Sequence, residues 1–437
     1  MLAHLKRNKH HHFLEPEING EVLTKGGAAE HLRDIVAKYP EVPRLIIMKT
    51  DVQRRGVFYT DAALSVLDEK KHSITGTHIF GTRDGKITPR PESLLLRDGT
   101  SIITTPTAIE ENPYVVDLLD GQPFLFDEGE PIEEVDYWPA PAFYGKLTRS
   151  GIPMQKIVSA RPQRLVINPH RYCTFWKNGN GCTFCDIVEQ IKKGKKDLQI
   201  QARPKAEEIA EIVAEALKEP GRYSAVFLTS GSVINGSEPF DEEIDIYIKV
   251  FNELGKLFRT KKFPSQIIGT AYSEVQLERL YLETGLMSYT ADIEVLNEDL
   301  FNRHCPGKAE WIGYKEWKRR LVKAVDIFGR GFVNTGLVAG IELTTPHGFK
   351  TEEEALQRTL EEADDLARQG VSTVFIVWSP RPNTVIGNQK NASLDYYIKL
   401  AKGLHELRLT YKLPIMFDDY RHCGNHPDTD LSRLLPF

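Results

Sequence analysis

The chain contains little cysteine and no long hydrophobic run, and these two shortages exclude whole classes of protein. Only 5 of its 437 residues are cysteine, too few for a small secreted scaffold that depends on disulfides. No apolar stretch approaches the roughly 18 to 20 residues that a membrane-spanning helix requires. The N-terminal stretch is basic and lacks the apolar segment of a secretory signal. We therefore expect a cytoplasmic protein with no membrane partner.

The chain also lacks an excess of charge of either sign. It has 56 Lys and Arg residues against 61 Asp and Glu residues, for a formal net charge of -5. Such a balance creates no overall field that would attract nucleic acid or an anionic membrane. The length exceeds what one ordinary hydrophobic core supports, so we expect two domains. The charge argues against nucleic acid as a partner.

Short apolar runs separated by Asp-Gly turns characterise residues 1–150. In 93–105, SLLLRDGTSIITT, two β-type runs surround Asp-Gly, which predicts a hairpin. The run RLIIMK at 44–49 predicts another strand, and a helix is expected at about 28–38. This part is expected to be an α+β domain with antiparallel hairpins and an unknown role. The Pro- and aromatic-rich stretch 136–145 is expected to connect it to the rest.

Beyond residue 151 the pattern changes to alternating strands and helices. Helical stretches such as 205–219 separate the short apolar runs, which lie at 164–168, 224–231, 265–271, 286–296, 332–342 and 372–380, with 414–417 as a candidate seventh. Such alternation is typical of parallel β/α crossovers. We therefore predict an α/β fold, a partial (β/α)6-type barrel over 151–425, followed by a C-terminal tail at 426–437. In such a fold the reactive groups gather at the C-terminal ends of the strands.

Three of the five cysteines lie together directly after the first run of this repeat. Cys173, Cys182 and Cys185 form a C-x8-C-x2-C pattern with a Gly-rich stretch inside it. Three thiolates on one loop suit a four-iron cluster that keeps one iron free of protein ligands. His170 would complete a Cys3His set for a structural zinc ion. The spacing alone leaves both interpretations open.

The cysteine loop resembles the signature of the radical S-adenosylmethionine (radical SAM) superfamily, nearest to the biotin synthase and hydrogenase-maturation barrels. The usual pattern there is C-x3-C-x2-C with an aromatic residue before the last cysteine, a position that Phe184 occupies here. The longer first gap places the chain in an atypical branch. The resemblance covers about 160–425. It implies a [4Fe-4S] cluster on the three cysteines, with S-adenosylmethionine bound to the open iron.

The resemblance also implies roles for residues at the ends of later strands. Glu294 matches an acidic residue that faces cofactor or substrate, and Arg303 after it is a second catalytic candidate, although the residues alone also allow a structural Glu294–Arg303 pair. The remaining cofactor-binding candidates match the methionine-side and adenine-side elements of the family: Thr229, Ser230, Gly231, Ser232, Gly340, Glu342, Val377 and Ser379. The usual acidic residue is absent from the first of these elements, so hydroxyls and carbonyls would replace it.

The chemistry that the resemblance implies is one-electron cleavage of S-adenosylmethionine, which generates a radical for hydrogen abstraction or group transfer. A low-potential donor, flavodoxin or ferredoxin, would supply the electron. The substrate would be a small molecule or a cofactor precursor. The isolated Cys305 and Cys423 are interpreted as ordinary thiols. The alternatives are an aminocarboxypropyl-transferring variant, a zinc-stabilised β/α protein without redox chemistry, and a nucleic-acid-modifying enzyme, against which the net charge argues.

Overall fold

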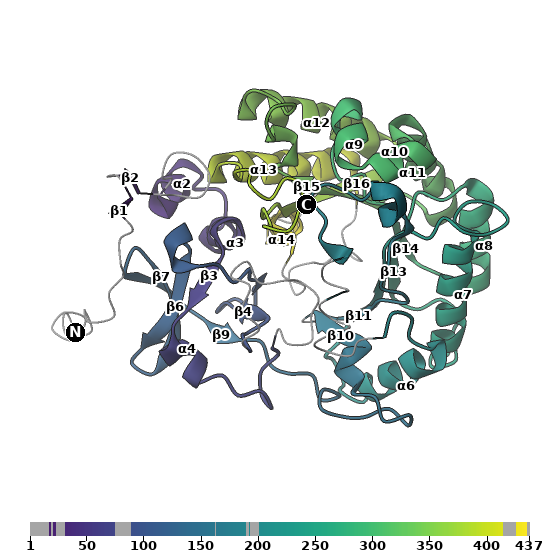
Figure 1. Cartoon of the computed structure of the whole chain (residues 1–437), viewed down its shortest axis with the longest axis horizontal. Coiled ribbons are helices and arrows are strands. Elements are labelled where there is room, and N and C mark those ends of the chain that lie inside the picture. The colour runs from purple at the N-terminus through teal and green to yellow at the C-terminus, as the bar shows by residue number, and fades with distance from the viewer. Residues whose placement is uncertain are drawn as a thin grey trace.

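The computed structural model describes residues 17–18, 21–22, 31–74, 89–161, 163–188, 192, 201–413 and 425–434. Figure 1 shows a curved array of strands and helices that runs from β10 to α13, with the N-terminal elements packed on its open side. Among the described residues, no helix combines the length and the hydropathy that crossing a membrane would require.

The central sheet has seven strands whose spatial order follows the chain: β10 (Val158–Arg161), β11 (Arg164–Ile167), β12 (Ala225–Thr229), β13 (Ser265–Ile268), β14 (Ser288–Thr290), β15 (Val333–Ala339) and β16 (Val371–Val377). The first two strands are antiparallel and all later neighbours are parallel. Among the described strands, the first and last do not pair with each other, so the barrel is partial. The predicted α/β class with a mostly parallel sheet is confirmed; β10 was not predicted.

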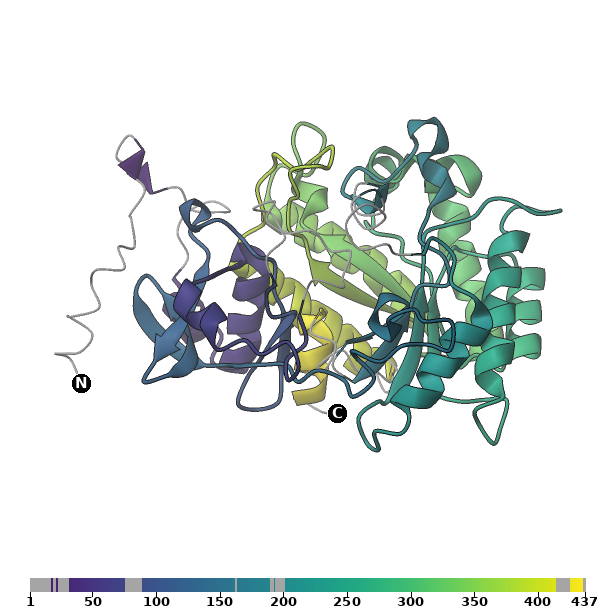
Figure 2. The same cartoon turned by 60° about the horizontal axis from the view of Figure 1, so that its bottom comes forward.

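Helices on the outer side connect the parallel strands (Figure 2): α6 (Ala206–Ala216), α7 (Asp241–Gly255), α8 (Glu274–Thr284), α11 (Tyr314–Phe328) and α12 (Glu352–Arg368). Helix α13 (Leu394–Tyr411) follows the last strand. Two short helices, α9 (Glu298–His304) and α10 (Pro306–Trp311), follow β14. A polar cap fixes the start of some of these helices: Thr351 accepts a hydrogen bond from the Glu354 backbone at α12.

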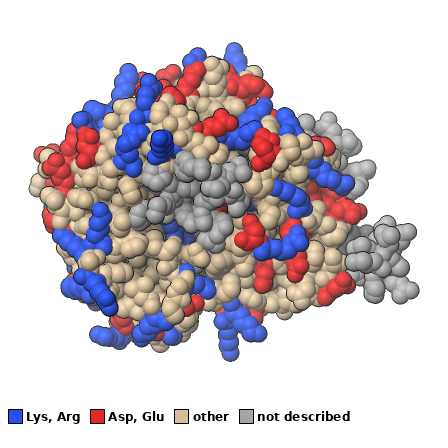
Figure 3. Space-filling model, turned by 180° about the vertical axis from the view of Figure 1, so that it is seen from behind, with Lys and Arg blue, Asp and Glu red and all other residues tan. Residues whose placement is uncertain are grey.

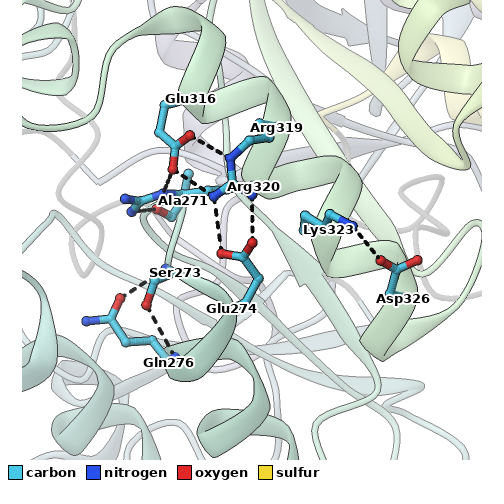
Figure 4. A network of polar contacts seen from close by, with 9 residues as sticks. All are labelled: Ala271, Ser273, Glu274, Gln276, Glu316, Arg319, Arg320, Lys323 and Asp326. Atoms are coloured by element: carbon cyan, nitrogen blue, oxygen red, sulfur yellow. Dashed lines mark hydrogen bonds and ion pairs between the residues drawn. The ribbon is translucent and has the colours of Figure 1, made fainter.

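Ion pairs cross-link neighbouring outer helices. Figure 4 shows Arg319 of α11 bound both to Glu316 on its own helix and to Glu274 at the start of α8. Arg320 also donates to the Ala271 carbonyl, 2.9 Å away. These contacts lie on the outer surface and hold the β/α units in register.

Charged side chains of both signs are interspersed on the face of the molecule that Figure 3 presents. Blue Lys and Arg side chains and red Asp and Glu side chains alternate over much of that face. This mixture agrees with the nearly balanced counts of 56 basic and 61 acidic residues in the chain.

The N-terminal part combines two small sheets with short helices, as the α+β prediction states. One sheet has the order β3-β6-β7-β8 and the other β5-β4-β9. Their elements are β3 (Val57–Tyr59), β4 (Ser93–Leu95), β5 (Ser101–Ile103), β6 (Tyr114–Leu119), β7 (Gln122–Asp127), β8 (Glu130–Glu134) and β9 (Asp136–Tyr137), with helices α2 (Leu32–Lys38), α3 (Arg44–Arg55) and α4 (Asp61–Ser65), while β1 (Glu17–Ile18) and β2 (Glu21–Val22) form a separate pair. The predicted β4–β5 hairpin is confirmed.

One predicted strand of this part is wrong. The run at 44–49 forms the first half of α3, a 12-residue helix. Every residue of α3 from Ile46 to Arg55 is buried, so its apolar residues show no amphipathic stripe. Periodicity cannot separate such a helix from a buried strand.

Helix α3 packs against the open side of the barrel. Its Lys49 forms a 2.5 Å ion pair with Asp430 of α14 (Pro427–Leu434), and both side chains have no exposed surface. Helix α14, part of the predicted tail, covers the edge strand β16: His426 Nδ1 donates to the Phe375 carbonyl at 2.9 Å. The division at residue 150 stays a prediction, and the candidate strand at 414–417 lies outside the described residues.

Candidate functional site

The three clustered cysteines lie side by side at the C-terminal end of β11. Cys173 precedes a short 3-10 helix at Thr174–Gly179, Cys182 and Cys185 follow that helix, and all three are partly buried. Burial and then the nearby Cys182 raise the pKa of the Cys173 thiol to about 11. Burial, followed by Cys182 and Cys173, also raises the pKa of Cys185. The three thiols are therefore close enough for their negative charges to repel one another.

The loop that follows β12 packs directly on Cys173. The backbone N–H and hydroxyl of Thr174 both donate to the Ser232 carbonyl, at 2.8 and 3.0 Å. Ser230 donates its hydroxyl hydrogen to the His170 carbonyl at 2.8 Å. A Cβ atom at Gly231 would lie only 2.4 Å from the Cβ of Cys173, so this approach requires glycine. The structure thus places predicted cofactor-binding residues 229–232 against the cysteine loop.

The junction between α9 and α10 also packs on the loop that carries the three cysteines. The Thr183 backbone N–H donates to the His304 carbonyl at 2.9 Å, and Gly307 N–H donates to Asn180 at 3.0 Å. Cys305 is fully buried at this junction. The hydrogen bond with Cys305, followed by burial, raises the pKa of Cys182 well above its usual value. Sequence analysis had interpreted Cys305 as an isolated thiol.

His304 fixes the α9–α10 junction through hydrogen bonds at both of its ring nitrogens. Thr344 donates its hydroxyl hydrogen to the Ile341 carbonyl, 2.7 Å away, so its oxygen accepts from Nε2–H of His304. Nδ1 of His304 consequently accepts from the Thr183 hydroxyl, 2.7 Å away. Burial lowers the pKa of His304 to about 4, which fixes this neutral form.

Glu294 lies in the segment that follows β14 and is paired with a lysine. Lys308 Nζ lies 2.6 Å from Glu294 Oε1, where sequence analysis had allowed a pair with Arg303. Arg303 is exposed on α9 and does not join this group. Burial, partly offset by Lys308, raises the pKa of Glu294 to about 7. Glu294 is therefore paired with Lys308 and Arg303 lies apart from this pair, while a catalytic role of either residue stays a prediction.

The backbone at Glu294 adopts a left-handed conformation, with φ of 72°. Such a value is uncommon for a residue other than glycine and persists only where the surroundings impose it. Here Glu294 N–H donates to Gly336 and the Glu294 carbonyl accepts from Val338 N–H, both at 2.9 Å, which extends the pairing of β14 with β15.

Glu342 is buried after β15, and its carboxylate is occupied by the protein. One oxygen accepts from Gly340 N–H at 2.8 Å and the other from the Tyr396 hydroxyl. Gly340 has φ of 110°, a conformation that favours glycine. Through these contacts the Glu342 carboxylate stabilises the turn at Gly340.

The remaining predicted cofactor-binding residues are dispersed around this end of the barrel. Val377 ends β16 and is buried, and Ser379 follows it with partial exposure. Phe184 is partly buried against the hydrophobic core between the two close cysteines. Their positions agree with a location near the strand ends, and their contact with a cofactor stays a prediction.

A buried carboxylate that sequence analysis missed, Glu243 of α7, fixes two strand-end loops. It accepts from Val233 N–H at 2.7 Å, from Thr270 and from the Tyr272 hydroxyl at 2.5 Å. Burial raises its pKa to about 7. The signal was present in the sequence, because Glu243 shares a helical face with the buried Tyr247 and Val250.

The Cys3His zinc arrangement is not formed. Over the residues that the structure describes, which include His170 and the three clustered cysteines, no three His, Cys, Asp or Glu side chains form a group that could hold a metal ion. The His170 ring donates from Nδ1 to the Tyr172 carbonyl at 3.1 Å. Its neighbouring charges are those of Arg203 and Glu242.

Comparison with known proteins gives little. No protein-family model matches the chain, and no curated protein matches it. Among solved structures, the chain is similar to the crystal structure of a radical SAM methyltransferase from Sphaerobacter thermophilus. The identity is 15%, the TM-score is 0.39, and the alignment covers 73% of this chain and 82% of that chain. A likeness at this level assigns no function.

Proposed function

We propose that the chain is a radical SAM enzyme in which Cys173, Cys182 and Cys185 hold a [4Fe-4S] cluster and S-adenosylmethionine binds beside it. One observation carries the proposal: three thiols from one loop, close enough that their charged forms would repel one another, lie at the C-terminal end of a mostly parallel sheet. In β/α barrels this is the end at which reactive groups gather.

The chemistry of the donor set fits a cluster. Burial opposes charge on each thiol, and each thiolate would raise the pKa of its neighbours. A cationic iron group reverses that balance, because thiolates bound to metal are stabilised in their charged form. The three cysteines do not converge on one metal position. A cluster offers a separate iron to each cysteine, so convergence is not required.

The loops around the thiols support the same proposal. Gly231 allows the loop after β12 to touch Cys173, and at Gly181 a Cβ atom would lie 2.3 Å from the Trp176 ring. Close backbone approach places amide groups near ligand sulfurs, which orients the ligands and tunes a bound cluster. Three protein ligands leave one iron open, and the bound cofactor pair would supply one-electron cleavage of a carbon–sulfur bond.

The chain's own residues would position the cofactor and the substrate. Ser230 and Ser232 place hydroxyl and carbonyl groups beside Cys173. Glu294 would orient a donor group of cofactor or substrate, because its carboxylate lies at the strand ends with 15% of the side chain exposed. We assign Gly340, Val377 and Ser379 to the adenine side. The substrate would be a small molecule or a cofactor precursor, and the electron would come from flavodoxin or ferredoxin.

An anaerobic product assay tests the proposal. The purified chain is reconstituted with iron and sulfide, reduced with dithionite, and mixed with S-adenosylmethionine. We expect 5′-deoxyadenosine by liquid chromatography and mass spectrometry. Methylthioadenosine would instead assign the aminocarboxypropyl-transferring variant. A reconstituted chain that carries no iron–sulfur cluster and leaves S-adenosylmethionine intact would contradict the proposal.

A further inference from the structure

Lys308 of α10 is held at a fixed position between the strand end and the cysteine loop. Its ammonium group lies 2.6 Å from Glu294 Oε1 and 2.5 Å from the Asp292 carbonyl oxygen. The same group lies 4.8 Å from the centre of the Trp317 ring, an arrangement that attracts a cation. Trp317 is itself fixed by a 3.2 Å hydrogen bond to the Ala291 carbonyl.

The charges around Lys308 are not balanced by a single ion pair. Besides Glu294, the groups that act on its ammonium are the Asp292 carboxyl and the thiols of Cys182 and Cys305. Asp292 accepts a 2.8 Å hydrogen bond from Gly336 N–H, so its carboxyl is fixed at the end of the strand. One lysine thus faces two carboxyl groups and two thiols. A stabilising ion pair with Lys308 requires only one carboxylate, so the further groups around this lysine suggest an additional role.

We propose that Lys308 is a positioning residue of this site, which orients the Glu294 carboxylate and, through its charge beside Cys182, favours the reduced state of the cluster. The inference rests on the proposed function. Reduction adds one electron and breaks no bond, so a nearby positive charge stabilises the product more than the reactant. The Lys308 side chain is 11% exposed, and salt screens buried charges much less than exposed ones.

The experiment compares reduction potentials in two variants that both lack the Glu294 carboxylate. Reconstituted Glu294→Gln and Glu294→Gln/Lys308→Met are titrated with dithionite under anaerobic conditions, and the reduced cluster is followed by its EPR signal. The shared Glu294→Gln substitution prevents proton uptake by that carboxyl group from masking the lost charge. We expect removal of Lys308 to make reduction about tenfold less favourable, which is about 59 mV for one electron.

Two further variants separate charge from packing. Lys308→Arg in the same background retains the charge and is expected to restore most of the potential. Lys315→Met is the matched control, because its side chain on the neighbouring α11 is 83% exposed. That control removes one charge at the surface and is expected to leave the potential unchanged.

The outcomes distinguish this inference from the proposed function. Equal potentials with and without Lys308, in variants that hold a full cluster, would overturn the role of Lys308 and leave the proposed function standing. A wild-type chain that forms no cluster on reconstitution would overturn both. If the double variant fails to fold, Glu294→Gln/Lys308→Gln, which keeps a polar side chain at position 308, replaces it in the same comparison, and a potential equal to that of Glu294→Gln would overturn the inference.

Discussion

Two regions of this molecule bury many charged or ionisable groups, but only one of them pairs each group with a partner of opposite charge. At the junction of α3, α13 and α14, cations and anions are matched: Lys49 pairs with Asp430, and Arg408 with Asp428. At the end of the sheet that carries the cysteines, groups that would carry like charge lie close together. The charged forms of the three thiols would repel each other, and Glu294 and Asp292 share one lysine.

The difference indicates which region has a structural task. In a matched pair each charge offsets part of the desolvation cost of the other, and removing one member leaves an uncompensated charge. Unmatched groups raise the free energy of the protein until another group joins them, which is why perturbed ionisable residues cluster at functional sites. The junction is therefore structural, whereas the cysteine end fits the cationic iron group that we propose. The predictions below follow in order of expected size.

The largest expected effect is loss of the proposed cluster on removal of one ligand. Cys173→Ser should reduce iron from about four per chain to almost none. Iron and sulfide analysis after anaerobic reconstitution measures this. Cys305→Ser is the matched control, because Cys305 contacts Cys182 without belonging to the ligand set, and it should retain iron. Full iron content in Cys173→Ser would contradict the assignment of a functional role to the region that carries the cysteines.

The next effect concerns the matched region. Lys49→Met removes the cation that pairs with Asp430 in a site with no exposure, and should cost about 3–5 kcal/mol of the free energy of unfolding. Lys49→Met combined with Asp430→Leu removes both charges and should recover most of that loss. Urea denaturation monitored by circular dichroism measures both. Equal loss in the single and double variants would show that the pair is not the cause.

A pH effect is expected from Glu243, an unmatched carboxyl group whose hydrogen-bond donors named above are all uncharged. Its pKa in the folded chain is about 7 because burial disfavours the charged form, above the unfolded value of roughly 4.3. The folded state therefore binds the proton more tightly. Its contribution to stability is fully present below about pH 4.3 and is lost as pH rises through about 7, on the order of 3 kcal/mol.

Glu243→Gln should therefore flatten the decline in stability between pH 5 and pH 8, measured by urea denaturation at each pH. Glu278→Gln on the exposed face of α8 is the control and should leave the slope of the wild type. A slope in Glu243→Gln as steep as that of the wild type would assign the pH dependence to other groups.

The smallest effect is expected from packing beside the thiols. Gly231→Ala would place a Cβ atom 2.4 Å from the Cβ of Cys173, so the cysteine must shift. We expect roughly tenfold weaker iron retention, in the range found when the surroundings of metal ligands are disturbed. Gly255→Ala on α7, where a Cβ atom meets nothing within 4 Å, is the control. Competition with an iron chelator measures the difference.

The sequence was sufficient for the parts of the fold that local signals determine. Helical periodicity placed α6, and the Asp-Gly turn placed the β4–β5 hairpin. It failed for α3, since a helix buried on all sides has no stripe. Sequence spacing placed the three cysteines on one loop, but their arrangement around a bound group remains a prediction.

The partners of the site residues were less accessible to sequence analysis. Glu294 and Lys308 meet only because α9 and α10 fold back over the cysteine loop. Arg303 follows Glu294 more closely in the chain, yet it lies on the exposed face of α9. Contacts that depend on how two short helices pack leave no periodic pattern, and so Cys305 and Lys308 were missed.

The most direct test of the account is the EPR spectrum of the dithionite-reduced, reconstituted chain before and after S-adenosylmethionine is added. We predict the signal of a reduced four-iron cluster whose g-values change on addition, because the added molecule binds the open iron. A chain without such a signal, or with a signal that S-adenosylmethionine does not alter, would contradict the account.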